Sequence, residues 1–149
     1  SKGILKQPIL YLSDFFEKNR MLYYDNLMRV RTHNDLSQWF KFFLSGIIET
    51  SKSGVTTFDS IMRLQKTLDI KLKTLGNRSV DARLVIESLY TKPVIDVKRI
   101  EIIIQKSNVS AYKLIASLEQ LEILHEITGG QRGRLYIFKD YVNLFKDKL

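Results

Sequence analysis

The stretch Ile123–Phe138, ILHEITGGQRGRLYIF, decides the fold class of the second half of the chain. Its outer runs, ILHEIT and RLYIF, are rich in the β-branched and aromatic residues that favour strands. The GGQRG between them contains glycines, which reach the positive φ angles of a tight turn at little cost. The pattern predicts a β-hairpin with Gln131, Arg132 and Arg134 near its tip.

The same glycines suggest a second interpretation, a phosphate-binding loop. Such a loop requires a following helix, because the amides and the positive dipole end of the helix N-terminus hold the anion. Here Arg134 is followed by LYIF, a predicted strand. We therefore interpret residues 128–134 as a hairpin turn rather than as a nucleotide cradle.

Upstream of the hairpin, the pattern predicts a helix, a short strand and two further helices. Ser79 can cap the first helix and Pro93 ends it, Val94–Asp96 form the strand, and Asp96 caps the next helix. Ser107 or Asn108 begins the third helix, whose apolar positions share a helical register: Val109, Tyr112, Leu114, Ile115, Leu118 and Leu121. This order is that of a winged helix-turn-helix, in which the third helix enters the major groove and the hairpin is the wing.

Residues 1–78 have helical periodicity throughout. Asp14 and Glu17 have capping-box spacing, and Asp35 can cap a second helix. The face that we expect this second helix to bury comprises Trp39, Phe40, Phe43, Leu44, Ile47 and Ile48. After SKSG at 51–54 the helical register resumes and continues to Gly76, a C-terminal stop signal. We predict a mainly α protein: a helical segment over 1–78, then a winged-helix domain over 79–149 that ends in a helix from about Lys139.

Composition restricts the class of protein. With 44% apolar and 27% charged residues the chain is typical of folded domains, and without cysteine it has no disulfide or thiol nucleophile. No apolar run approaches the roughly 18 residues of a membrane helix, and no signal-peptide pattern is present. We expect a cytoplasmic protein with no membrane partner. Because Ser1 lies close to patterned sequence, we also expect a longer parent protein.

The net charge of +8 suggests a nucleic-acid partner, but its distribution weakens that inference. Residues 1–78 hold 13 Lys/Arg against 7 Asp/Glu, whereas residues 79–149 hold 11 against 9. Most of the basic excess therefore lies outside the predicted DNA-binding domain. Scattered cations of this kind are typical of a solvated surface.

Three segments resemble the C-terminal part of Fic-family proteins: PILYLSDFFEKNRMLYYDNLMRVR at 8–31, WFKFFLSGI at 39–47 and LEQLEILHEIT at 118–128. In that family similar segments follow the catalytic core, and many bacterial members append a winged helix ending in an LxxLGILxEIT pattern. The resemblance implies a parent that is a protein adenylyltransferase, which transfers AMP from ATP to a protein hydroxyl (AMPylation) with Mg.

The family's catalytic motif, His-x-Phe-x-x-Gly-Asn-Gly-Arg-x-x-Arg, is absent from this chain. Neither His33, in RTHND, nor His125, in LHEIT, begins it. We expect no catalytic residue and no cofactor here, with the core upstream of residue 1. The resemblance places Tyr11 at the edge of the nucleotide pocket, although a core tyrosine is the alternative. Two isolated histidines also predict no metal site.

The candidate DNA contacts lie on the third helix and the wing. On the helix we expect an exposed face with Ser110, Ala111, Tyr112, Lys113 and Ser117, and on the wing Gln131, Arg132 and Arg134. However, the segment 108–124 has one Lys against two Glu, and a helix that binds DNA usually has more basic residues to face the phosphates. A protein-interaction or dimerisation module, binding a target protein or a second copy, is the alternative.

Overall fold

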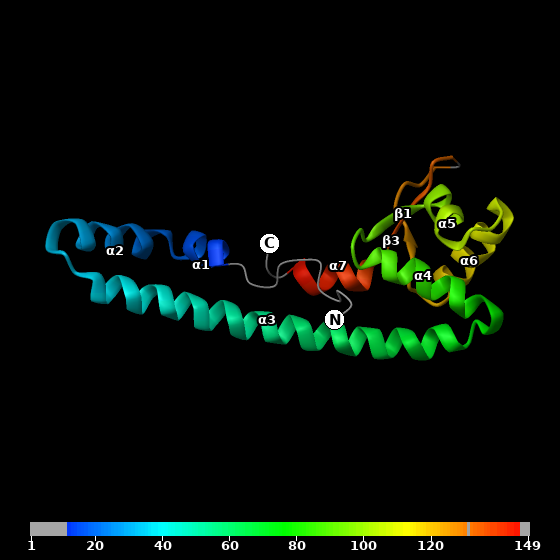
Figure 1. The fold of residues 1–149 in the computed structure, drawn as a ribbon. Coiled ribbons are helices and arrows are strands. Elements are labelled where there is room, and N and C mark those ends of the chain that lie inside the picture. The colour runs from blue at the N-terminus through cyan, green and yellow to red at the C-terminus, as the bar shows by residue number, and fades with distance from the viewer. Residues whose placement is uncertain (1–11, 131, 147–149) are drawn as a thin grey trace. The chain divides into compact units, whose positions relative to one another are not determined.

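The structure is a computed structural model that describes residues 12–130 and 132–146 (Figure 1). These residues are mainly helical, with one small antiparallel sheet. They form two compact units, residues 12–59 and residues 60–146, and the long helix α3 (Leu36–Lys73) contributes to both.

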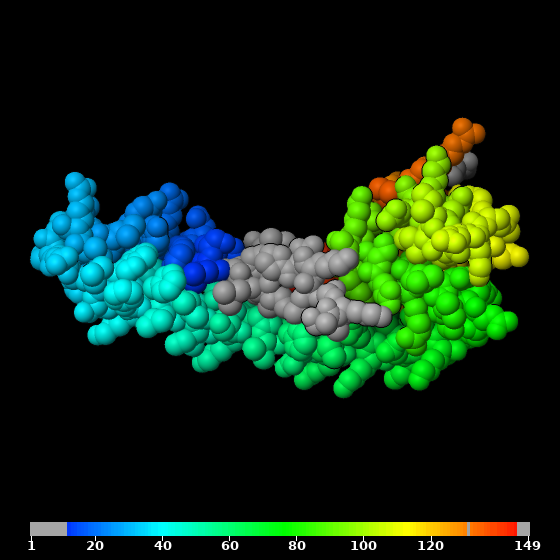
Figure 2. Space-filling view, viewed as in Figure 1, coloured from blue at the N-terminus to red at the C-terminus, as the bar shows by residue number. Residues whose placement is uncertain are grey.

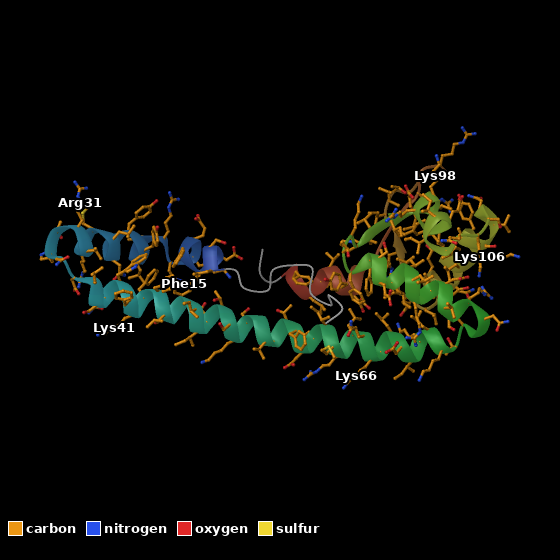
Figure 3. All side chains as sticks on the ribbon, in the orientation of Figure 1. Phe15, Arg31, Lys41, Lys66, Lys98 and Lys106 are labelled. Atoms are coloured by element: carbon orange, nitrogen blue, oxygen red, sulfur yellow. The ribbon has the colours of Figure 1, made fainter. Side chains whose placement is uncertain are left out.

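The first unit combines α1 (Leu12–Lys18), α2 (Arg20–His33) and the N-terminal part of α3. Aromatic rings hold these helices together, with centroids 5.2 to 6.5 Å apart among Phe15, Phe16, Tyr23, Trp39, Phe42 and Phe43. The ring of Phe15 lies between α1 and α3 (Figure 3). A Cβ atom at Gly46 would stand 2.6 Å from Phe15 Cδ1, so glycine permits this close approach.

Two predictions for this unit are wrong. Helix α1 begins at Leu12, so Asp14 lies inside its first turn and does not cap it. The SKSG stretch does not interrupt α3, which runs unbroken from Leu36 to Lys73. The hydroxyls of Thr50 and Thr57 bond to carbonyls one turn back, so these polar side chains are satisfied within the helix. The predicted cap at Asp35 is confirmed, since its Oδ1 accepts from the amides of Ser37 and Gln38.

The predicted buried face of α3 is correct in part. Trp39, Phe43 and Ile47 are half-buried, but Phe40, Leu44 and Ile48 are each more than half exposed. Gly46, which was not predicted, is buried beneath Phe15. Gly46 determines which side of α3 is buried, because α1 can approach α3 closely only where the side chain is this small.

The second unit contains four helices and the sheet. Its elements are α4 (Ser79–Leu89), β1 (Val94–Asp96), α5 (Val97–Ile104), α6 (Asn108–Gln120), β2 (His125–Glu126), β3 (Leu135–Ile137) and α7 (Lys139–Lys146). The strands pair in the order β1-β3-β2, with Ile95 opposite Tyr136 and Glu126 opposite Tyr136. The predicted short strand, hairpin and final helix are confirmed. So is the Asp96 cap, whose Oδ1 accepts from Arg99 N at 2.7 Å.

One hydrophobic core holds this unit together and begins before the predicted boundary at residue 79. Its members come from the C-terminal part of α3, from the four helices and from β1 and β3, and include Ile61, Leu68, Leu72, Val85, Leu89, Ile100, Leu114, Leu118, Tyr136, Phe138 and Tyr141. The last turns of α3 belong to it because Ile61, Leu68 and Leu72 repeat at helical spacing on one face. Residues 60–147 consequently hold 15 Lys/Arg against 10 Asp/Glu, a balance of +5.

The junction between α3 and α4 differs in detail from the prediction. Gly76 has the left-handed φ of 55° expected of a helix stop, and it opens a 3-10 turn, η1 (Gly76–Arg78). This turn continues directly into α4, so the position before the helix, Arg78, is itself helical and Ser79 does not cap it.

Candidate nucleic-acid interface

One face of α6 is open to solvent. It comprises Val109, Tyr112, Lys113, Ala116 and Gln120, all exposed, and we call it the α6 face. At 100° per residue these five positions lie within about 60° of Val109 around the helix axis. The opposite side, with Ala111, Leu114, Ile115 and Leu118, is in the core. Val109, predicted to share the apolar register, is 61% exposed. Tyr112 was placed both in that register and among the exposed contact residues, and it is 45% exposed.

The predicted contact residues of α6 divide into two groups. Tyr112 and Lys113 are exposed as predicted, and Ser110 is half-buried with its hydroxyl 3.2 Å from that of Ser107. Ala111 and Ser117 are buried, so their predicted exposure is wrong. The reason is helical phase, which turns Ala111 to the core and Ser117 toward η1.

Arg78 covers Ser117 and was not among the predicted residues. Its Nη1 donates to Ser117 Oγ at 2.6 Å and to the carbonyl of Lys113 at 3.4 Å. The exposed guanidinium therefore lies on the flank of α6, next to the backbone of Lys113. No local pattern could identify it, because 39 residues separate Arg78 from Ser117.

The carboxylate of Glu126 holds the first residues of the hairpin loop (127–134), Thr128 and Gly129. Its Oε1 accepts from Thr128 N at 2.7 Å, from Gly129 N at 2.9 Å and from the Thr128 hydroxyl. These bonds, chiefly those from Thr128, hold the pKa of Glu126 below its ordinary value. The Thr128 hydroxyl in turn accepts from Leu135 N at 3.2 Å, which connects the two strands.

The glycines of the loop have the predicted role. Gly129 and Gly133 have φ angles of 65° and 66°, in the left-handed region that favours glycine. The loop is followed by β3, so no helix N-terminus faces these amides. The loop tip projects from the second unit (Figure 2).

The arginines of the loop differ in their anchoring. Arg134 Nε donates to the carbonyl of Gly130 at 2.9 Å, whereas Arg132 extends as an exposed side chain. Gln131, the third predicted residue of the loop, lies outside the described residues, as does Tyr11.

Tyr136 connects the hairpin to α6. Its side chain is 2% exposed, and burial raises its pKa while a hydrogen bond with Arg134 opposes the rise. Tyr112 and Glu119 of α6 also lie within electrostatic range of its hydroxyl. Tyr136 therefore lies near both Arg134 of the hairpin loop and α6.

The cations of this unit are only partly neutralised. Lys106 Nζ lies 2.6 Å from Asp81 Oδ2, and Arg83 lies 3.0 Å from Asp69. Lys98 lies in the first turn of α5, and Lys106 follows the end of that helix (Figure 3). No salt bridge to Arg78, Lys113, Arg132 or Arg134 is found among the described residues. Acidic neighbours of this group are Glu119, in the C-terminal half of α6, and Glu126, on which the charge of Arg134 acts.

A separate cleft of about 1100 Å³ lies along the free edge of β1. Leu84, Glu87, Lys92, Arg99 and Leu135 are among its lining residues, which mix apolar and oppositely charged groups. Within residues 12–130 and 132–146, no group of three or more His, Asp or Glu side chains is placed to hold a metal ion. The helices in the same ranges include none with the length and apolar character needed to cross a membrane.

Comparisons with models of protein families and with curated proteins found no match to this chain.

Proposed function

We propose that residues 60–147 form a winged helix-turn-helix domain that binds duplex DNA, with α6 in the major groove and the hairpin 125–137 as the wing. The observation that carries the proposal is the exposed α6 face beside an ordered hairpin, in the element order α4-β1-α5-α6-β2-β3. In winged-helix readers the equivalent helix and hairpin contact the duplex.

Charge supports this proposal. The compact unit carries +5, more than the +2 of residues 79–149, because α3 and η1 contribute cations to it. Arg78 and Lys113 stand on the flank of the α6 face, where phosphates border the groove. Arg132 and Arg134 would meet phosphates or the minor groove from the wing.

The chain as a whole we propose to be the C-terminal region of a cytoplasmic Fic-family protein. The support is the resemblance of residues 8–31, 39–47 and 118–128 to that family. The parent would be a protein adenylyltransferase that uses ATP and Mg in a core upstream of residue 1. The first unit would complete its scaffold, and the winged helix would serve autoregulation or positioning on DNA.

The DNA proposal is tested by fluorescence anisotropy with a labelled 20-base-pair duplex over a range of salt concentrations. Non-specific binding in the range of about 10⁻⁴–10⁻⁶ M is expected, with affinity falling as salt rises. The double change Arg132→Ala, Arg134→Ala should weaken binding and reduce the slope of log K against log salt by roughly 1.8. Arg63→Ala, Lys66→Ala removes the same charge from α3 and is the matched control. A chain that binds no duplex at low salt contradicts the proposal.

The alternative is a protein-interaction or dimerisation module. Exposed Val109, Tyr112 and Ile102 favour it, since apolar side chains at a surface suit a protein partner. It predicts concentration-dependent association in sedimentation that Tyr112→Glu abolishes, with no response to DNA.

The family proposal has its own test. Incubation of this chain with labelled ATP and candidate proteins should transfer no label. The reading frame upstream of residue 1 should encode the His-x-Phe-x-x-Gly-Asn-Gly-Arg motif, and a frame without it contradicts the family assignment.

A further inference from the structure

The composition of the α6 face is unusual for the solvent side of a helix. Three of its five residues, Val109, Tyr112 and Ala116, present apolar groups, and Lys113 is its one charged member. Val109 is 61% exposed, so its methyl groups are in water in the free protein. Binding to such a face releases the most free energy when the partner offers apolar groups of matching size, because apolar groups on both sides then leave water.

The cations beside the face favour a partner that is anionic. Arg78 is held on one flank of α6 by Ser117, and Lys113 lies beside it. A stripe of apolar groups with cations along one side is complementary to the DNA major groove, where phosphates border the base edges. The apolar group that the groove offers is the C5-methyl of thymine.

Given the proposed DNA binding, on which this inference rests, we propose that the α6 face recognises A·T base pairs through their thymine methyl groups. Val109 and Ala116 would contact the methyls, with the ring of Tyr112 beside them. Gln120 fits the same partner, because a glutamine amide pairs with N6 and N7 of adenine. Recognition of guanine through O6 and N7 would require Arg or Lys, of which the face has only Lys113.

The experiment replaces thymine by deoxyuridine, which removes the methyl group and keeps the base pairing and the phosphate charge. Three 16-base-pair duplexes are compared at one salt concentration: an A·T-rich duplex, the same duplex with every thymine replaced by deoxyuridine, and a G·C-rich duplex. The thymine duplex should bind about four-fold tighter than the deoxyuridine duplex for each methyl group that the face covers.

Two variants test whether a preference for thymine over deoxyuridine comes from the α6 face. Val109→Ala should lower the thymine-to-deoxyuridine ratio and leave the salt slope unchanged, because it removes apolar contact but no charge. Ile102→Ala is the matched control, since Ile102 is 65% exposed on α5 and lies outside the face. It should keep the wild-type ratio.

The possible outcomes distinguish a failure of methyl recognition from a failure of DNA binding itself. Equal affinity for the thymine and deoxyuridine duplexes overturns the methyl recognition while DNA binding itself stands. Failure to bind any duplex overturns both. A preference for thymine that Val109→Ala leaves unchanged also overturns the inference, because the preference would then come from DNA shape.

Discussion

The guanidinium of Arg78 bonds the hydroxyl of Ser117 at 2.6 Å and so fixes a cation of η1 on the flank of α6. Ser117 is 7% exposed and also donates to the carbonyl of Lys113 at 2.9 Å. The serine therefore keeps a partner when the arginine is removed. This arrangement separates the effect of Arg78 on ligand binding from its effect on folding.

We expect Arg78→Ala to weaken duplex binding and to reduce the slope of log K against log salt by about 0.9, the loss of one phosphate contact. The free energy of unfolding should change by no more than about 1 kcal/mol, because no buried hydroxyl loses its last partner. Salt-dependent anisotropy and urea unfolding measure the two quantities. Arg83→Ala, which removes a cation paired with Asp69, should leave the salt slope unchanged.

Glu126→Gln should loosen the hairpin loop. The neutral amide is a weaker acceptor than the carboxylate for the amides of Thr128 and Gly129, so these amides should exchange faster with solvent. Because the folded pKa of Glu126 is below its ordinary value, its contribution is present above pH 4.5 and is lost as pH falls through the folded pKa. Amide exchange followed by NMR at pH 6 and below pH 4 should show this loss in the wild type only.

Burial raises the pKa of Tyr90 from 10.0 to about 12, against a hydrogen bond with Gln65 that lowers it. A raised folded pKa means that the unfolded chain ionises first. The free energy of unfolding should therefore decline between pH 10 and pH 12, and Tyr90→Phe should make that decline shallower. Urea unfolding at pH 9 and pH 11 measures it, and equal declines in both proteins would contradict the assignment.

Glu122→Gly should stabilise the second unit. Glu122 has a φ of 57° where α6 ends, with Ile123 N bonded to Leu118 O and Glu122 N to Glu119 O, a Schellman motif. The LxxLGILxEIT pattern has glycine at this position. Relief of the left-handed strain is worth about 1 kcal/mol. Glu119→Gly, the same substitution inside α6, should instead destabilise by about 1 kcal/mol in urea unfolding.

Gly46→Ala should loosen α1 from α3. The added Cβ would meet Phe15 Cδ1 at 2.6 Å, and overpacking of this kind costs roughly 1–3 kcal/mol. Hydrogen exchange of residues 12–18 should accelerate, and Phe15→Leu in the same chain should reverse part of the effect. Ser45→Ala, at the exposed neighbouring position, should leave the exchange unchanged.

The sequence by itself determined the local features. β-Branched runs around Gly129 and Gly133 predicted the hairpin, and the side chains of Asp35 and Asp96 predicted the caps that form, because turns and caps depend on nearby residues. Tyr112 and Lys113 were predicted to be exposed, although the apolar register also included Tyr112.

The tertiary structure decided what depends on distant contacts. Gly46 sets the phase of α3 through Phe15. The last turns of α3 join the second core, which adds three net positive charges to the second unit. The burial of Ala111 and Ser117 and the placement of Arg78 on α6 follow from packing between α6, η1 and the core. Such contacts join residues far apart in the chain, so the local pattern of either partner does not contain them.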